Sequence, residues 1–266
     1  MTHPATSNGM GFKLAKLMRR IRRNIGHPET LNILSGPGKG LKFKVLPNDT
    51  SFDLGINEVP VQEAFAGILK PGQVFFDIGA NFGFFTIIGG RLVGKTGQVI
   101  AFEPVPGNAR TVRYNIAANH FDHVTLMEMA VAEKPGRGKL FVTAHSGGST
   151  LASVRRPQDT TEEIEVTLES IDSLRQAGKI PAPDVVKIDV EGAEMGVLLG
   201  MTETISNSRP TFLIEVDDAE RTRLDEKKSA IMRWLRERGY GIRELPDAYP
   251  GSPWYVDHIV AEPEGN

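Results

Sequence analysis

The chain has 266 residues, of which 40% are apolar and 24% charged, and its formal net charge is −2. This length and composition suit one large globular domain, and a net charge near zero excludes binding to nucleic acid through overall charge. Cysteine is absent, which excludes disulfides and thiolate metal sites, and no apolar run is long enough to cross a bilayer.

The amino-terminal segment, residues 1–35, differs in composition from the rest of the chain. Residues 1–9 are predicted to be disordered. In residues 12–25, apolar side chains fall roughly on one helical face, and six Lys and Arg side chains occupy the remainder. A basic amphipathic helix of this kind can pack on the domain or on a partner, or it can lie on an anionic membrane. We expect a cytoplasmic protein in which the helix packs on the domain or on a partner, and weak attachment to the membrane surface is the alternative.

Residues 36–72 are predicted to be an extension that precedes the main domain at residues 73–266. A short strand is predicted at Leu41 to Leu46, after a turn rich in Gly and Pro. A helix is predicted at Val59 to Leu69, where a Pro-Gly pair ends it.

The most informative stretch opens the main domain. A predicted strand, Val74 to Ile78, leads through a glycine turn into a predicted helix, Gly83 to Leu92, and a second strand follows at Gln98 to Phe102. Asp77 lies at the end of the first strand, and Glu103 follows the second. Glycine lets the backbone approach a ligand, and a helix N-terminus presents free N–H groups. Because an acid after the second strand can accept hydrogen bonds from both ribose hydroxyls, this stretch predicts a nucleoside-cofactor site.

The glycine turn discriminates between cofactors. Its order is Asp-x-Gly-x-Asn-x-Gly, from Asp77 to Gly83, whereas G-x-G-x-x-G would place three glycines around a dinucleotide pyrophosphate. An acid at the strand end suits a positively charged ligand, such as the ammonium and sulfonium of S-adenosylmethionine. The turn therefore favours a methyltransferase over an NAD-dependent enzyme, and a turn with no ligand is the third interpretation.

The rest of the main domain alternates between predicted strands and helices, which implies parallel strands with helices on both faces of the sheet. The last two strands are joined by a loop, and we expect them to form an antiparallel hairpin at one edge. Two further strands form an inserted pair around a polar loop, residues 145–150. In chain order, the predicted strands are 124–129, 139–143, 163–168, 185–189, 211–216, 240–245 and 255–261, and the predicted helices are 107–119, 168–177, 193–199 and 225–238.

A second group of polar residues surrounds Asp189, which ends an apolar strand at the edge of the sheet where ligands bind in such folds. Lys187 shares one side of this strand and is expected to pair with an acid. Glu191 and Glu194 follow in the first turn of a helix, where negative charge is favourable. Glu215 ends a neighbouring strand, so we expect it to lie beside Asp189.

Four segments of the chain, in order FFDIGANFGFFT, AFEP, VKIDVEGAE and FLIEV, resemble the FkbM-type family of S-adenosylmethionine-dependent methyltransferases. The resemblance covers about Pro71 to Val216. It implies the class I methyltransferase fold, an α/β Rossmann-like fold with a seven-stranded, mostly parallel sheet that ends in an antiparallel hairpin. It also implies that the protein methylates a hydroxyl group on a sugar, a natural product or another small molecule.

The same resemblance implies a role for individual residues. The glycine turn would hold the methionine end of the cofactor, the acid after the second strand the ribose, and two residues at the end of the third strand the adenine. The cofactor-binding residues that it implies are Asp77, Gly79, Asn81, Gly83, Glu103, Pro104, Ala130, Val131 and Asp189.

Methyl transfer to a hydroxyl requires a base that removes its proton. Asp189 is our first candidate for the base, and His258 is the second, since a single His on a terminal strand is more often structural. The polar loop could cover the acceptor, and an ordinary surface loop is the alternative. The candidate acceptor-binding residues are Glu191, His145, Ser149 and Glu215.

The acids at the strand ends also raise the question of a metal. Asp189, Glu215 and Asp217 could hold Mg²⁺, because hard cations prefer carboxylate oxygens. The same acids can pair with Lys187 or cap helices, so no metal ligand is assigned.

Two other functions are considered. One is a methyltransferase-like binding module that has lost its chemistry, and the other is an NAD-dependent oxidoreductase, against which the missing third glycine argues. We predict a small-molecule acceptor and no nucleic-acid partner, because no basic stripe with interleaved aromatic residues occurs beyond residues 12–25. The pattern specifies neither the acceptor nor the oligomeric state.

Overall fold

The computed structural model describes residues 30–44, 51–143, 149–154, 159–252 and 254–265. The predicted amino-terminal tail, the basic helix, the last two residues of the first predicted strand and His145 lie outside these residues. Among the described residues, no helix is both long enough and apolar enough to cross a membrane.

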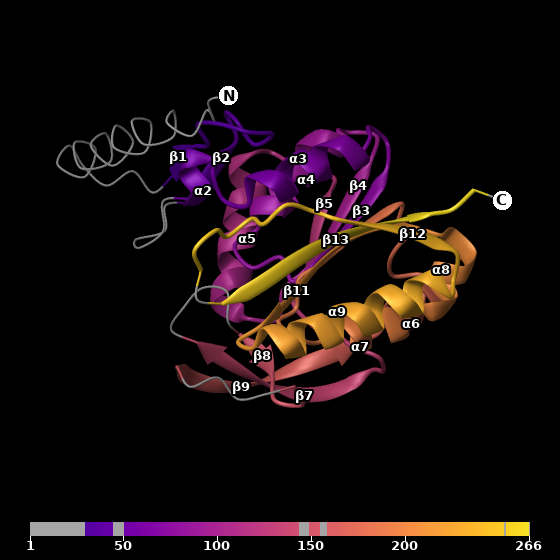
Figure 1. Ribbon diagram of the computed structural model, residues 1–266. Helices are drawn as coiled ribbons and strands as arrows, with labels where there is room; N and C mark the ends of the chain where they lie inside the picture. The colour runs from indigo at the N-terminus through magenta and orange to yellow at the C-terminus, as the bar shows by residue number, and fades with distance from the viewer. Residues whose placement is uncertain (1–29, 45–50, 144–148, 155–158, 253, 266) are drawn as a thin grey trace, which may run out of the picture.

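A seven-stranded sheet forms the centre of the molecule (Figure 1). Its strands are β3 (Val74–Ile78), β4 (Gln98–Phe102), β5 (Val124–Met127), β10 (Val185–Ile188), β11 (Thr211–Asp218), β12 (Tyr240–Glu244) and β13 (Tyr255–Pro263). They lie in the order β12-β13-β11-β10-β3-β4-β5. From β11 to β5 neighbouring strands pair in parallel, whereas β13 is antiparallel to both β11 and β12. The predicted antiparallel pair is therefore present, with its last strand inside the sheet and β12 at the edge.

Helices cover both faces of this sheet, which explains why its strands are apolar on both sides. In β3, Phe75 packs with residues of the first helical layer, and the next residue, Phe76, packs with the second. One layer contains α3 (Val59–Ile68), α4 (Phe84–Val93) and α5 (Pro106–Ala118), and the other contains α6 (Ile171–Gln176), α7 (Glu194–Leu199), α8 (Thr202–Ser208) and α9 (Arg221–Arg236).

A second sheet has the order β6-β9-β7-β8 and consists of β6 (Ala130–Val131), β7 (Gly136–Thr143), β8 (Thr150–Leu151) and β9 (Thr160–Glu169). The antiparallel pair β7–β9 confirms the predicted insertion. The prediction that Ala130 and Val131 end the third strand of the main sheet is wrong. That strand ends at Met127, where a tight turn closes with Met129 N donating to Met127 O at 3.0 Å, and β6 then pairs in parallel with β9.

The amino-terminal extension packs into the core of the main domain. β1 (Thr30–Asn32) and β2 (Lys42–Lys44) form an antiparallel pair, and α2 (Ser51–Leu54) follows. The ring of Phe43 lies 5.5 Å from that of Phe52 and 5.9 Å from that of Phe84 in α4. Asn115 of α5 accepts a hydrogen bond from Lys44 N at 2.8 Å. These contacts fix the turn that leads into α3, which contributes an acid to the site described next.

Candidate active site

The turn between β3 and α4 lies against both neighbouring strands. The backbone nitrogens of Gly79 and Ala80 each donate to Phe102 O of β4 at 3.0 Å. On the other side, a Cβ atom on Gly79 would lie 1.8 Å from the carbonyl oxygen of Asp189, and Gly79 has a φ of 86°. Both the conformation and the space therefore require glycine at this position.

Glu103, directly after β4, closes this turn. Its Oε2 accepts a hydrogen bond from Asn81 N at 2.8 Å, and its Oε1 accepts one from Val105 N at 2.9 Å. Burial raises the pKa of Glu103 to about 7, against the opposing effect of these hydrogen bonds. A carboxylate has about four acceptor positions, so the side chain can still accept hydrogen bonds from a ligand. Its predicted contact with a ribose stays a prediction.

Asn108, to which the sequence analysis gave no role, also belongs to this part of the site. Its Nδ2 lies 3.2 Å from Asn81 Oδ1 and 3.4 Å from Glu103 Oε1. The available signal was its position in the first turn of α5, close behind Glu103. Asn108 therefore links the glycine turn to the end of β4.

Asp77 is buried beneath the turn. Its Oδ2 accepts a hydrogen bond from Thr86 Oγ1 of α4 at 2.5 Å, whereas its Oδ1 is buried with no hydrogen-bond partner among the described residues. Burial raises the pKa of Asp77, because the charged form is poorly solvated there. A carboxylate oxygen in this state fits the positively charged end of a ligand such as S-adenosylmethionine.

Lys187 and Asp189, at the end of β10, form an ion pair in which the lysine is buried and the aspartate is partly exposed. Lys187 Nζ donates to Asp189 Oδ2 at 2.6 Å and lies 4.8 Å from the centre of the Phe85 ring. The side chain of Lys187 is 4% exposed and that of Asp189 is 24% exposed. Burial alone would lower the pKa of Lys187, but the surrounding carboxylates outweigh burial and raise this pKa above its ordinary value. Lys187 is therefore an ammonium paired with an acid, as predicted.

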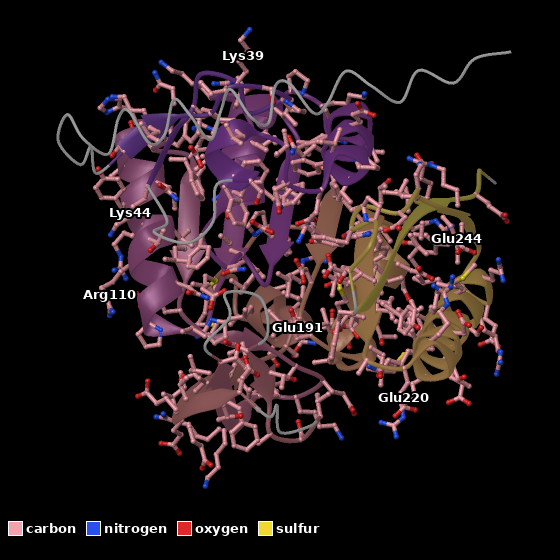
Figure 2. The ribbon with its side chains drawn as sticks, turned by 60° about the vertical axis from the view of Figure 1, so that its left-hand side comes forward. Lys39, Lys44, Arg110, Glu191, Glu220 and Glu244 are labelled. Carbon is pink, nitrogen blue, oxygen red and sulfur yellow. The ribbon has the colours of Figure 1, made fainter. Side chains whose placement is uncertain are left out.

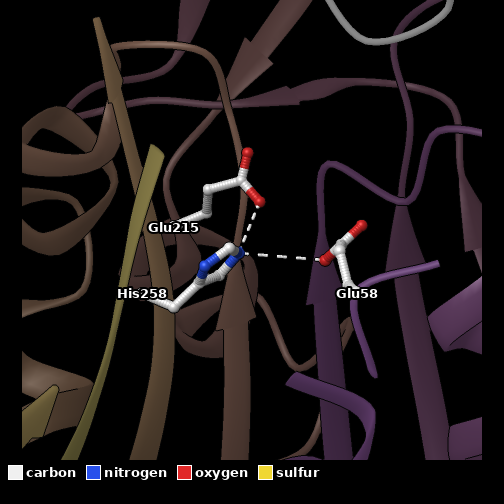
Figure 3. A group of neighbouring side chains, drawn as sticks. All are labelled: Glu58, Glu215 and His258. Carbon is white, nitrogen blue, oxygen red and sulfur yellow. Dashed lines mark hydrogen bonds and ion pairs between the residues drawn. The ribbon is translucent and has the colours of Figure 1, made fainter. Parts of the chain in front are cut away.

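Three further side chains converge next to this pair (Figure 3). His258 of β13 and Glu215 of β11 are register partners, and His258 Nε2 lies 2.7 Å from Glu215 Oε2. Glu58, in the turn before α3, brings its Oε2 to 3.8 Å from the same nitrogen. The ring of Tyr249 stacks on His258 with a centroid distance of 6.1 Å. We call Glu58, Glu215 and His258 the Glu-Glu-His cluster.

The Glu-Glu-His cluster is buried and acidic. Burial lowers the pKa of His258, which is 2% exposed, so its ring is mainly neutral near pH 7. Burial and the charge of Glu215 raise the pKa of Glu58 to about 7. Burial also raises the pKa of Glu215 well above its ordinary value, and the charge of Asp189 adds to this. The structure thus brings Glu215 close to Asp189, and Glu58 is a member that the sequence analysis missed.

The remaining predicted residues lie around this centre. Glu191 has a φ of 54°, and its carbonyl oxygen accepts a hydrogen bond from Thr150 Oγ1 of β8 at 2.9 Å. Figure 2 shows Glu191 between the central sheet and the second sheet. Ser149 directly precedes this contact, so the described end of the polar loop reaches the turn after β10. Glu194 accepts a hydrogen bond from Gly192 N at 2.7 Å, as expected for an acid at a helix start.

The other residues predicted to bind ligands can be placed in the fold. Whether these residues contact a ligand stays a prediction. Gly83 precedes α4 with a φ of 82°, and Pro104 is half-buried after Glu103. Ala130 and Val131 are buried in β6. Asp217, which was considered as a Mg²⁺ ligand, accepts a hydrogen bond from Trp254 Nε1 at 2.6 Å, and its binding of a metal stays untested.

Comparison with known proteins identifies a family. Residues 77–242 match the family described as the methyltransferase FkbM domain. The chain is 28% identical over 200 residues to the 31-O-demethyl-FK506 methyltransferase FkbM of Streptomyces tacrolimicus, which covers 65% of this chain and 75% of that protein. It is also 28% identical over 153 residues to the 2-O-methyltransferase NoeI of Sinorhizobium fredii, covering 53% of this chain and 62% of the relative. The hexuronic acid methyltransferase AglP of Haloferax volcanii is 27% identical over 149 residues, covering 51% of this chain and 52% of the relative.

Solved structures share the fold. A methyltransferase FkbM from Methylobacillus flagellatus superposes with a TM-score of 0.50 at 17% identity, over 76% of this chain and 53% of that one. A protein described as a putative rRNA methylase from Clostridium thermocellum has the same TM-score at 10% identity, over 83% of this chain and 100% of that one. Both matches support a mixed α/β methyltransferase fold around a large central sheet.

Proposed function

The chain belongs to the FkbM methyltransferase family, and we propose that it transfers the methyl group of S-adenosylmethionine to a hydroxyl oxygen of a small molecule. The observation that best supports S-adenosylmethionine as the cofactor is the pair of buried carboxylates, Asp77 and Glu103, on either side of the glycine turn. Two of the relatives are named for methylation at oxygen, which supports a hydroxyl acceptor. A sugar or another polyhydroxylated small molecule is the acceptor class that we favour, since AglP is named for a hexuronic acid.

The cofactor supplies a methyl group that its sulfonium already activates. Asp77 would face the positive charge at the methionine end through Oδ1, the buried oxygen without a hydrogen-bond donor. Glu103 would accept the ribose hydroxyls, and Gly79 would let the backbone come close to the ligand. The chain thus binds and orients the donor with groups that the fold has already fixed in place.

We assign Asp189 as the general base that removes the proton of the acceptor hydroxyl. It lies at the carboxyl end of β10, and its carbonyl oxygen directly adjoins Gly79 of the cofactor turn. Lys187 holds one carboxylate oxygen, which leaves the other for the acceptor. His258 is less suited, because its Nε2 is already bonded to Glu215. Alignment of the hydroxyl with the methyl group is worth several kcal/mol in such in-line reactions.

The first experiment identifies the reaction. The full-length protein is incubated with S-adenosylmethionine carrying a ¹³C-labelled methyl group and with fractionated metabolites, and the labelled product is examined by NMR. We expect an O-methyl product together with S-adenosylhomocysteine. Calorimetry with S-adenosylhomocysteine and with NAD separates the alternatives. Binding of the former with no transfer to any fraction would indicate an inactive binding module, and binding of NAD alone would indicate an oxidoreductase.

The second experiment tests the base. Asp189→Asn is nearly isosteric, and we expect it to lower turnover about 10²-fold or more while affinity for S-adenosylhomocysteine stays almost unchanged. Asp218→Asn is a matched control, because Asp218 also ends a strand and pairs with a lysine, Lys227, at 2.8 Å. Its turnover should stay near that of the wild type. Normal turnover in a well-folded Asp189→Asn protein would remove Asp189 from the mechanism and promote His258.

A further inference from the structure

The Glu-Glu-His cluster offers a set of ligand atoms that the proposed methyl transfer does not use. Glu58, Glu215 and His258 each present one such atom, and the three atoms all lie within 4.8 Å of one another. Figure 3 shows both carboxyl groups directed toward His258 Nε2, with Glu215 above it and Glu58 to its right. Ligand atoms about 2.1 Å from a shared ion lie about 3 to 3.5 Å apart, and the observed 2.7 and 3.8 Å contacts bracket this range.

A second observation comes from Glu58 alone. Its Oε2, the oxygen that points into the cluster, is buried and has no hydrogen-bond partner among the described residues. Its Oε1 is held by Asn57 Nδ2 at 2.6 Å, and the whole residue is only 8% exposed. Glu58 also has a φ of 50°, in the left-handed region that non-glycine residues rarely occupy. The fold therefore accepts backbone strain and directs an unsatisfied carboxylate oxygen into the cluster.

The balance of charge around the cluster gives a third observation. The carboxylates of Glu58, Asp77, Asp189 and Glu215 all act on Lys187, which is the buried cation between them. Four acids against one ammonium leave an excess of negative charge in a buried region, where uncompensated charge is costly. A divalent cation would remove most of the excess, and protonation of the acids is the alternative.

We propose that Glu58, Glu215 and His258 bind one divalent transition-metal ion, with Mn²⁺ as the best match. Carboxylate oxygens suit Mg²⁺, Ca²⁺ and Mn²⁺, whereas imidazole suits Zn²⁺ and other transition metals, and Mn²⁺ accepts both types of ligand. His258 presents Nε2, a ring nitrogen that can bind a metal, to both carboxyl groups. This ligand set differs from the Mg²⁺ set of strand-end acids considered from the sequence, and it includes a residue from before the main sheet.

The role of the ion rests on the proposed function, although its binding does not. Three protein ligands leave coordination positions for an acceptor hydroxyl, whose pKa a cation lowers. The hydroxyl proton then passes to Asp189, the oxygen forms a bond to the methyl carbon, and the carbon–sulfur bond breaks with its electron pair going to sulfur. The cluster would therefore place and activate the acceptor oxygen beside the proposed base.

Binding of Mn²⁺ can be measured without any acceptor. The full-length protein is treated with a chelator, dialysed and titrated with Mn²⁺, while the electron paramagnetic resonance signal of free Mn²⁺ reports the unbound ion. We expect one ion per chain. Glu58→Gln and His258→Gln should each weaken Mn²⁺ binding about 100-fold or more, since loss even of a residue that only supports a ligand costs 10- to 100-fold.

Glu194→Gln is the matched control. Glu194 is also buried, and burial raises its pKa to about 7, but it lies outside the three residues that converge. This variant should bind Mn²⁺ as the wild type does. Circular dichroism and the thermal shift caused by S-adenosylhomocysteine establish that each variant is folded, so a loss of Mn²⁺ binding in a folded variant supports the proposal.

Different results would refute the metal site and the proposed methyltransferase function. No saturable Mn²⁺ binding by the wild type, or unchanged binding by folded Glu58→Gln, would overturn the metal site and indicate that protons neutralise the cluster. Displacement of Mn²⁺ by an equal concentration of Mg²⁺ would overturn the transition-metal assignment. Full methyl transfer by the metal-free protein would overturn the role given to the ion. Mn²⁺ binding without binding of S-adenosylhomocysteine would instead refute the proposed function and keep the site.

Discussion

The two halves of the candidate site are built in different ways. The cofactor half, from Asp77 to Glu103, is a single β–α–β unit whose carboxylate at the end of β4 is held by backbone N–H groups. The acidic half combines Glu58, the Lys187–Asp189 pair, Glu215 and His258, which come from four separate segments and are linked through their side chains. A short motif can specify the first half, whereas the second exists only when the whole domain is assembled.

This difference predicts which substitutions are most damaging. The acidic half depends on compensation between buried charges, so the loss of one charge should leave several others uncompensated. The cofactor half depends on backbone geometry, so steric changes in its turn should matter more than changes of charge. The two halves meet where Gly79 adjoins the backbone of Asp189.

Removal of the positive charge of Lys187 should cause the largest loss of unfolding free energy. Lys187→Met keeps the length of the side chain but leaves buried carboxylates without their ammonium, and we expect unfolding free energy to fall by about 3–5 kcal/mol. Chemical denaturation at neutral pH measures this loss. Lys227→Met is the control, because Lys227 pairs with Asp218 at 2.8 Å but is 31% exposed, and it should lose about 1 kcal/mol or less. Equal losses would show that the acidic half is no more dependent on compensation than the surface.

The contact between the halves gives the next prediction. Gly79→Ala places a Cβ atom 1.8 Å from a backbone oxygen, and the strain of a positive φ adds to this clash. We expect a loss of about 2–4 kcal/mol in unfolding free energy. Gly40→Ala isolates the effect of φ, because Gly40 has a φ of 85° and nothing within 4 Å of an added Cβ, so it should cost about 1 kcal/mol. If both variants lose the same amount, the approach of Gly79 to Asp189 is not close.

Prediction from sequence succeeded for the fold where local signals were strong. The predicted bounds of β3 and β4 agree with the structure, because short apolar runs there are bounded by glycine, proline and acids. α9 begins at Arg221, four residues before its predicted start, because its first turn is charged and carries no apolar period. α8, only Thr202–Ser208, and β1, only Thr30–Asn32, were not predicted, since packing and pairing partners stabilise elements this short more than their own sequence does.

For the candidate site, too, prediction succeeded for residues with a local sequence signal and failed for those without one. Asp77 and Glu103 could be assigned from spacing alone, since the strands that carry them define where they lie. Glu58 could not, because its place in the site follows from how the extension packs on α4 and α5, which no local pattern encodes. His258 was a candidate by residue type, but its partner Glu215 depends on the register between β11 and β13. The sequence predicted a contact between neighbouring parallel strands, Glu215 beside Asp189, but not the contacts that depend on the packing of the extension or on the register of β13.

Loss of the carboxylate after β4 should weaken cofactor binding without loss of the fold. Glu103→Ala removes the acceptor proposed for the ribose hydroxyls, and we expect S-adenosylhomocysteine to bind about 1–3 kcal/mol more weakly by calorimetry. Glu128→Ala removes an exposed acid just after the next strand and should leave the affinity unchanged. Wild-type affinity in Glu103→Ala would show that the ribose is held by other groups.

The smallest effect is a dependence of cofactor affinity on pH. The pKa of Glu103 is raised from 4.5 to about 7, mainly by burial, with the charge of Asp77 acting in the same direction. Ribose hydroxyls donate to the ionised carboxylate, so binding favours the deprotonated form. Affinity should therefore reach its full value about one unit above pH 7 and fall as pH drops through 7, with binding at pH 6 about tenfold weaker than at pH 8.

Calorimetric titrations of S-adenosylhomocysteine at both pH values measure this ratio, and Glu103→Gln serves as the control because its side chain does not titrate. We expect the control to bind more weakly than the wild type at pH 8 and to show little change between the two values. A pH dependence that persists in Glu103→Gln would assign the titration to another group, either Asp77, whose pKa burial also raises, or an acid of the acidic half. If the dependence persists in Asp77→Asn as well, the two halves are coupled through Gly79 and Asp189, and the cofactor half cannot be treated as a self-contained unit.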